Sequence, residues 1–149
     1  TINTRNITTL FEPVNPIDDD YRYKLWFYNA PGNISLPYLY FNQVEIPLVT
    51  LSEVYYIGAE CSVDNDRRLS YLNKIRAHRG LTPLSEDVDI SQEIEKEYKK
   101  EFLGKGQMFY YFKRFNKSRM GALNTVSIST EQYTLPIPID EIDYGKINN

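Results

Sequence analysis

Residues 51–116 constrain the fold more than any other part of this 149-residue chain, because nearly all of its helical periodicity lies there. The first periodic run has the i, i+3, i+4, i+7 spacing of one helix face, and Thr50 followed by Glu53 is a capping box that predicts where the helix begins. We therefore predict a helix over residues 51–62. Its largely buried side chains are expected to be Leu51, Val54, Tyr55 and Ala59.

A tight polar turn, Asp64-Asn65-Asp66, separates this helix from a second predicted helix over residues 66–79. Leu72 and Ile75 are its expected core residues, and Gly80 is expected to end it. Two helices joined by so short a turn form an αα-hairpin of the tetratricopeptide type.

Two more helices complete the predicted helical core. One covers residues 90–103, where Asp89 and Gln92 offer a capping pair and apolar side chains recur every four residues. Glycines at positions 104 and 106 then interrupt the pattern, and residues 107–115 can form a short aromatic helix. The expected core residues are Ile94, Tyr98 and Phe102. The fold class is therefore mainly α: a TPR-like hairpin plus two helices.

The two flanking regions are predicted to be extended. Residues 1–20 are polar and interrupted by prolines, which indicates a surface segment. Residues 21–28 alternate in the manner of a strand, and with a turn at 30–33 and an aromatic run at 36–41 they predict a β-hairpin. Residues 121–134 are expected to be a surface loop, and prolines keep residues 133–139 extended before a short turn at 140–144. We expect a single domain over residues 1–149, with an amino-terminal region (1–50), a helical core (51–116) and a Pro-rich tail (117–149).

Short motifs follow one another in order along residues 47–144. They are Pro47-Leu48, Leu51-Ser52-Glu53-Val54-Tyr55-Tyr56-Ile57 with Ala59-Glu60, Leu72-Asn73 with Ile75-Arg76 and Arg79-Gly80-Leu81, Ile94 with Glu97-Tyr98 and Glu101-Phe102, Gly106-Gln107 with Phe109 and Lys113-Arg114, and Leu135-Pro136-Ile137-Pro138 with Glu141-Ile142. Together they resemble the carboxyl-terminal part of the SusD/RagB family of nutrient-uptake lipoproteins of Bacteroidetes. Asp20-Tyr21-Arg22 resembles a D-x-R motif of the same family. Members of the family are several times longer, so we expect a carboxyl-terminal fragment or an unusually short relative.

The resemblance implies a non-enzymatic glycan-binding protein on the bacterial cell surface. Such a protein passes an oligosaccharide or polysaccharide to a SusC-like, TonB-dependent transporter in the outer membrane, and its only link to the membrane is an amino-terminal lipid anchor, which would lie outside this sequence. The alternative is a helical-repeat module that contacts other proteins and has no ligand of its own. Exposed aromatic rings would favour the first interpretation, and rings packed inward would favour the second.

Glycan-binding proteins stack flat aromatic rings on sugar rings and bond the hydroxyl groups with amides and acids. Side chains of this kind cluster in the amino-terminal region, where the candidate ligand residues are Trp26, Tyr28, Tyr38, Tyr40 and Asn42. The competing interpretation is that these rings form the core beneath the hairpin.

Charge and composition argue against several other classes of protein. Seventeen basic and twenty acidic residues give a net charge of −3, which disfavours a general nucleic-acid binder. Residues 96–119 nevertheless hold eight basic side chains against two acidic ones. We expect them to join the third and fourth helices through a pair between Glu97 or Glu101 and Lys113 or Arg114; the alternative is an anion-binding patch.

Catalytic and metal chemistry are poorly supported by the sequence. The candidate soft metal ligands are Cys61, expected to be a small buried hydrophobe, and His78, expected to cap a helix at the surface. Glu97 and Glu101 could in principle form the carboxylate pair of a glycosidase, but on a lysine-rich helix we expect them to be structural. No cofactor and no metal are expected.

Overall fold

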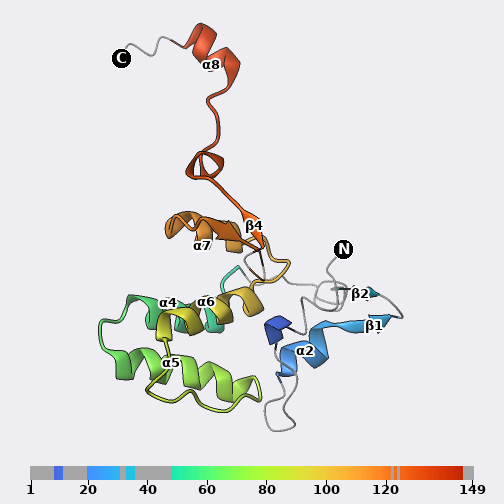
Figure 1. Ribbon diagram of the computed structural model, residues 1–149, viewed down its shortest axis with the longest axis vertical. Helices are drawn as coiled ribbons and strands as arrows, with labels where there is room; N and C mark the ends of the chain where they lie inside the picture. Colours follow the sequence, from blue (N-terminus) through green and yellow to red (C-terminus); the bar gives the residue numbers. More distant parts are fainter. Residues whose placement is uncertain are drawn as a thin grey trace.

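The computed structural model describes residues 9–11, 20–30, 33–35, 48–121, 123 and 125–145. This part of the chain is mainly α-helical, as predicted, and two short antiparallel ribbons flank the helices (Figure 1). The helices are α2 (Tyr21–Trp26), α4 (Leu51–Cys61), α5 (Asn65–His78), α6 (Ile90–Glu101), α7 (Met108–Arg114), the 3-10 helix η1 (Thr130–Tyr133) and α8 (Ile139–Tyr144). The strands are β1 (Tyr28–Ala30) with β2 (Asn33–Ser35), and β3 (Arg119–Met120) with β4 (Val126–Ser127).

The helices α4 and α5 pack against each other as the predicted hairpin, and their ends follow the predicted local signals. The Thr50 hydroxyl accepts the backbone N–H of Glu53 at 3.3 Å, and the Asp64 carboxylate accepts that of Asp66 at 3.1 Å. At the other end of α5, Gly80 has a φ of 76°, a left-handed conformation that favours glycine. The resemblance of this hairpin to a tetratricopeptide unit stays a prediction.

The helix α6 packs against both helices of the hairpin, and α7 lies on its other side (Figure 1). The Asp89 carboxylate accepts the backbone N–H groups of Ser91 and Gln92, as the predicted capping pair requires. After α6, Gly104 and Gly106 both have a positive φ, of 76° and 75°. Because both residues have a left-handed conformation, the chain reverses its direction here and continues as α7.

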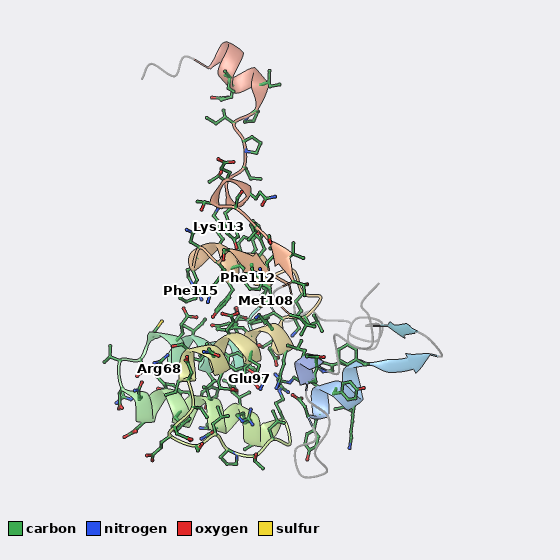
Figure 2. The ribbon with its side chains drawn as sticks, viewed as in Figure 1. Arg68, Glu97, Met108, Phe112, Lys113 and Phe115 are labelled. Atoms are coloured by element: carbon green, nitrogen blue, oxygen red, sulfur yellow. The ribbon has the colours of Figure 1, made fainter. Side chains whose placement is uncertain are left out.

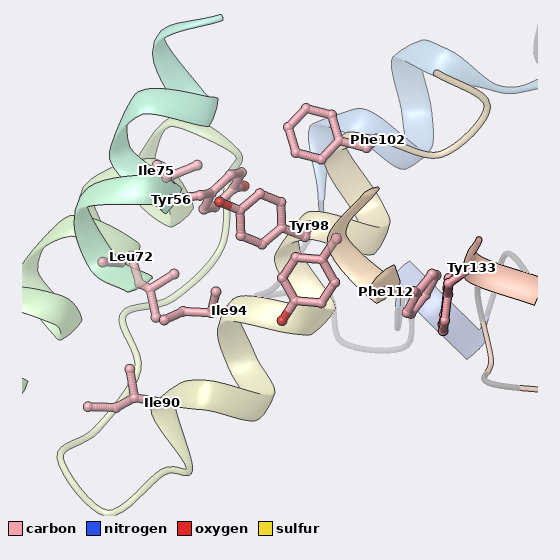
Figure 3. Packing of buried hydrophobic residues seen from close by; sticks show 11 residues of the cluster. Tyr56, Leu72, Ile75, Ile90, Ile94, Tyr98, Phe102, Phe112 and Tyr133 are labelled. Atoms are coloured by element: carbon pink, nitrogen blue, oxygen red, sulfur yellow. The ribbon is translucent and has the colours of Figure 1, made fainter. Parts of the chain in front are cut away.

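The main core lies between the hairpin, α6 and α7 (Figure 3). Tyr98 is at its centre, with its ring 5.3 Å from that of Tyr56 and 4.8 Å from that of Tyr111. The predicted core residues Ala59, Leu72, Ile75, Ile94, Tyr98 and Phe102 are all buried.

The prediction for the buried face of α4 is wrong at two of its four positions. Leu51 and Val54 are 71% and 53% exposed, Tyr55 is only half-buried, and Tyr56 is instead completely buried. The reason is that the hairpin faces a charged interior here. Tyr56 turns inward because its hydroxyl group hydrogen-bonds to charged side chains from α2 and α6.

Residues 21–26 form the helix α2, so the predicted strand over residues 21–28 is wrong. The buried residues of α2 are Arg22 and Trp26, four positions apart as on a helix face. The alternation places Arg22 on the mixed face of a strand, opposite the apolar face, whereas in the structure ionic partners elsewhere in the chain hold it inside. A hairpin does follow, but its strands are β1 and β2, and residues 36–41 lie outside the described part of the chain.

Three smaller expectations are also wrong. Leu10 and Phe11, expected in a surface segment, are buried in a second cluster with Trp26 and Phe27. Tyr133, expected in an extended tail, is buried against Phe109, and its hydroxyl donates to the Lys117 carbonyl at 2.8 Å. Cys61 is exposed, because it lies about 200° around α4 from the buried Ala59. The tail after η1 leads away from the helical core to α8 (Figure 1).

Candidate functional site

A cluster of buried charges joins α2 to the hairpin and to α6, and its centre is Glu97. This carboxylate accepts Arg22 Nη2 at 2.7 Å, the Tyr56 hydroxyl at 3.2 Å and Lys100 Nζ at 3.2 Å. We call the whole set the central ion cluster: Asp20, Arg22, Tyr56, Arg76, Arg79, Glu97, Lys100, Glu101 and Lys105. Glu97 lies on the side of α6 that faces α5 and α2 (Figure 2).

The electrostatics of this cluster explain why Glu97 is ionised although it is fully buried. Burial by itself would raise the pKa of Glu97, but the nearby charges of Arg22, Lys100 and Arg76 lower that pKa from 4.5 to about 2. Glu101 is likewise engaged, with Arg79 Nη2 at 3.1 Å from both of its oxygens. Both carboxylates therefore hold structural cations, as the sequence predicts.

The basic stretch around α7 makes ion pairs, but not with the predicted partners. Arg114 Nη2 lies 2.6 Å from Glu60 Oε2 of α4, and Lys117 Nζ lies 2.7 Å from Glu95 Oε2 of α6. Glu97 and Glu101 instead pair with members of the central ion cluster. The predicted pair between these glutamates and Lys113 or Arg114 is therefore wrong, although the basic stretch does attract acidic helix surfaces.

Two pockets lie along the outer face of α6 and share Lys99. The first, which we call the polar pocket, has a volume of about 640 Å³. Oxygen and nitrogen groups from α6 and from the segment after α7 provide most of its walls. Its described lining residues are Thr9, Leu10, Gln92, Glu93, Glu95, Lys96, Lys99, Lys117, Ser118, Arg119 and Leu123.

The second pocket, the apolar pocket, has a volume of about 460 Å³ and lies between the end of α6 and α7. Phe102, Phe109 and Phe112 provide aromatic surface, and Met108 and Leu103 add aliphatic surface. Figure 2 shows Met108 and Phe112 on the side of α7 that faces α6. The three glycines of the lining, Gly104, Gly106 and Gly121, leave backbone exposed to the pocket.

The polar pocket and the apolar pocket offer a ligand different kinds of contact. Glu95 in the polar pocket accepts Lys99 and Lys117, each at 2.7 Å, and these partners outweigh the effect of burial and lower the pKa of Glu95 to about 2. Ionic groups are thus fixed on one side of Lys99 and aromatic rings on the other.

The structure places one of the predicted ligand side chains, that of Trp26. Its ring is only 8% exposed, packed in the second cluster beneath the Arg79 guanidinium and the Lys105 ammonium, so for this residue the structure favours the competing interpretation of a ring in the core. The side chain of Tyr28 and the whole of Tyr38, Tyr40 and Asn42 lie outside the described part of the chain. Their role in ligand binding stays a prediction.

Sequence reasoning missed the pocket residues Phe109 and Arg119. Residues 107–115 are predicted only as a short aromatic helix of the helical core, and in the structure Phe109 and its neighbour Tyr110 are 38% and 71% exposed. So short a helix cannot bury all of its rings, and its length was the available signal for exposed aromatic side chains. For Arg119 the sequence offers no comparable signal.

The described residues contain no group of three or more His, Cys, Asp or Glu side chains that could hold a metal ion. None of the helices in this part of the chain is long and apolar enough to span a membrane.

Comparison with protein families gives a match to the SusD family over residues 38–134, well over half of the chain. This chain belongs to the SusD family. The match includes α4 to α7 and most of the residues that line the two pockets, and it ends before the proline-rich motif that begins at Leu135. Comparison with curated proteins and with solved structures gave no match. Membership of the SusD family supports, in general terms, a glycan-binding role in nutrient uptake.

Proposed function

We propose that this SusD-family chain is a non-catalytic binding protein for an oligosaccharide or polysaccharide. In this proposal it acts at the outer surface of the outer membrane and delivers its ligand to a SusC-like, TonB-dependent transporter. The observation that carries the proposal is the family match over residues 38–134, which includes the face of α6 on which both pockets open.

The two pockets support a glycan as the ligand. Sugars combine an apolar C–H face with a rim of hydroxyl groups, and binding sites for small molecules in general pair apolar walls with a few fixed polar groups. Phe102, Phe109 and Phe112 supply apolar walls, while Gln92, Glu93 and Ser118 supply groups that can bond hydroxyls. The volumes of about 640 and 460 Å³ each lie within the range of roughly 300–1,000 Å³ that is usual for ligand pockets.

The binding partners of two carboxylates on α6, Glu95 and Glu97, argue against a role for these two groups in acid–base catalysis. General acid–base catalysis requires a carboxyl group that can exchange a proton near neutral pH. Glu95 and Glu97 both have a pKa lowered to about 2, so neither gives up or takes a proton there. Both stay ionised and bound to lysine or arginine side chains.

A protein-contact module is the second candidate, and the outer face of α4 is the observation that favours it. Leu51, Val54 and Ile57 are exposed there, next to Leu48 and Val49. Exposed apolar side chains that gather on one face often mark a protein interface. A module of this kind would bind no glycan.

Isothermal titration calorimetry with a panel of neutral and acidic polysaccharides tests the proposal. We expect at least one to bind, and Phe109→Ala to weaken that binding by about tenfold, because it removes an aromatic wall of the apolar pocket. Tyr110→Ala is the matched control, since that ring is adjacent and exposed but does not line the pocket. Equal loss in both variants would argue against the pocket, and absence of binding across the panel would favour the protein-contact module.

A further inference from the structure

A third pocket opens on the hairpin, where α4 and α5 meet, and neither the family match nor the proposed function assigns it a ligand. We call it the hairpin pocket. Its volume is about 250 Å³, below the usual range for drug-sized ligands, which suits a molecule of about one ring. Its lining residues are Leu51, Ser52, Tyr55, Lys74, Ile75, His78 and Arg79.

The lining of the hairpin pocket combines positive charge with apolar surface. Lys74 and Arg79 are cationic, the His78 ring adds nitrogen atoms and Ser52 adds a hydroxyl group, while the described lining holds no carboxylate. Lys74 Nζ lies 5.1 Å from the centre of the Tyr55 ring. Leu51 and Ile75 supply the aliphatic part of the wall.

Arg79 is held rigidly, and one of its donors is unused. Its Nη2 donates to Ser52 Oγ at 2.9 Å and to Glu101 at 3.1 Å, and its guanidinium group lies 6.0 Å from the centre of the Trp26 ring. Its Nε is buried and has no hydrogen-bond partner within the described residues. The Arg79 side chain as a whole is 26% exposed and lines the hairpin pocket, so its guanidinium charge can attract an anion there.

The central ion cluster adds to this preference for an anion. In the described residues it contains three carboxylates, those of Asp20, Glu97 and Glu101. Against these stand five cations: Arg22, Arg76, Arg79, Lys100 and Lys105. Glu53 also attracts Lys105 electrostatically, which leaves five cations against four carboxylates in this set. One of the cations, Arg79, lines the hairpin pocket, and its side chain is 26% exposed.

We propose that the hairpin pocket binds a single ring that carries a carboxylate, such as a uronic acid. The carboxylate pairs with Lys74 and Arg79, His78 and Ser52 bond hydroxyl groups, and the ring packs on Leu51 and Tyr55. The site lies on the hairpin and not on the α6 face, so it is separate from the two pockets that carry the proposed function.

Titration of the isotopically labelled chain with sodium glucuronate, followed by NMR, tests the proposal. We expect amide shifts at Ser52, Tyr55 and Ile75, and at least tenfold weaker binding of glucose, which has CH₂OH in place of the carboxylate. The double variant Lys74→Gln, His78→Gln should weaken glucuronate binding at least fivefold. Both side chains are exposed, so the variant should fold, and its melting temperature checks this. Lys113→Gln, which removes one positive charge from the exposed face of α7, should bind as the parent does.

Three outcomes would overturn the proposal. One is equal affinity for glucose and glucuronate. Another is unchanged binding in the double variant. The third is displacement of glucuronate by an equal concentration of acetate, which would mean that the pocket takes a free carboxylate and that the ring contributes nothing. Phe109→Ala separates this site from the proposed function: it should leave glucuronate binding intact, whether or not the α6 pockets bind a glycan.

Discussion

Glu97 connects three parts of the chain through its side chain alone. Arg22 comes from α2, Tyr56 from α4 and Lys100 from α6, and all three donate to its oxygens within the buried interior. Ions in such a place are stable only when they are fully paired, because the cost of removing them from water is large. Asp20 and Arg22, the D-x-R residues, thus have a structural role, with Asp20 Oδ2 2.8 Å from Arg22 Nη2.

Glu97→Gln should lower the free energy of unfolding by about 3–5 kcal/mol, because it leaves Arg22, Lys100 and Arg76 without their shared negative charge. Urea denaturation measures the loss. Glu86→Gln, at an exposed position of the loop before α6, is the control and should change stability by less than about 0.5 kcal/mol. A loss below about 1 kcal/mol for Glu97→Gln would mean that the ion cluster is not needed for the fold.

The lowered pKa of Glu97 also predicts how the stability of the chain depends on pH. The folded-state pKa of Glu97 is about 2, below its ordinary value of 4.5, so its stabilising effect is complete above pH 4.5 and is lost as the pH falls toward 2. The difference in stability between the parent chain and Glu97→Gln should therefore shrink over this range, since a protonated Glu97 resembles glutamine. Urea denaturation of both chains at pH 7, 4 and 3 measures that difference. If the difference in stability between the two chains stayed constant from pH 7 to pH 3, this would contradict a lowered pKa of Glu97 in the folded chain.

At the scale of elements, capping residues and terminal glycines in the sequence predicted the helices whose ends they mark. Thr50, Asp64 and Asp89 cap α4, α5 and α6, and Gly80 follows α5, within one or two residues of the predicted limits. The helix α2 could not be predicted in this way. Its burial depends on Arg22, whose partner Glu97 is 75 residues away, and a periodicity analysis counts arginine as a surface residue.

The turn between α6 and α7 gives a second element-level prediction. Gly106 has a φ of 75°, and a Cβ added there would meet no atom within 4 Å. The cost of Gly106→Ala is therefore the backbone cost alone, about 1–2 kcal/mol. Gly106→Asn should cost less, because asparagine adopts the left-handed conformation more readily. Chemical denaturation compares the two variants, and equal stability of both with the parent would show that the turn is not fixed at this residue.

Arg114 joins α7 to α4 through its pair with Glu60, and it should contribute much less to the stability of the chain than Glu97 does. Its side chain is 53% exposed, and exposed pairs contribute about 0–1 kcal/mol. Its guanidinium group also lies 5.6 Å from the centre of the buried Tyr111 ring and 5.1 Å from that of the exposed Phe115 ring. Arg114→Ala should lower the stability by about 1 kcal/mol, which is a fall of roughly 2–4 °C in melting temperature for a domain of this size. A loss above about 3 kcal/mol, measured by thermal denaturation, would mean that this pair is effectively buried.

At the scale of the whole molecule, the family and the mainly helical class could be predicted, but the pockets could not. Short motifs that follow one another in a fixed order along the chain are sufficient to predict the family and the helical class. The polar pocket brings together side chains from positions 9–10, 92–99, 117–119 and 123. The buried Trp26 ring packs in one cluster with Phe11 and Phe27. Such associations depend on tertiary packing, which residue spacing does not encode.

The central claim is that the molecule binds a glycan and leaves it unchanged. Equilibrium dialysis against a panel of polysaccharide digests, followed by chromatography of the recovered sugars, tests both parts in one measurement. We predict that at least one oligosaccharide is enriched on the protein side and is recovered at its original length. Absence of enrichment for every sugar would contradict the binding claim, and recovery of shortened products would contradict the claim that the protein is not an enzyme.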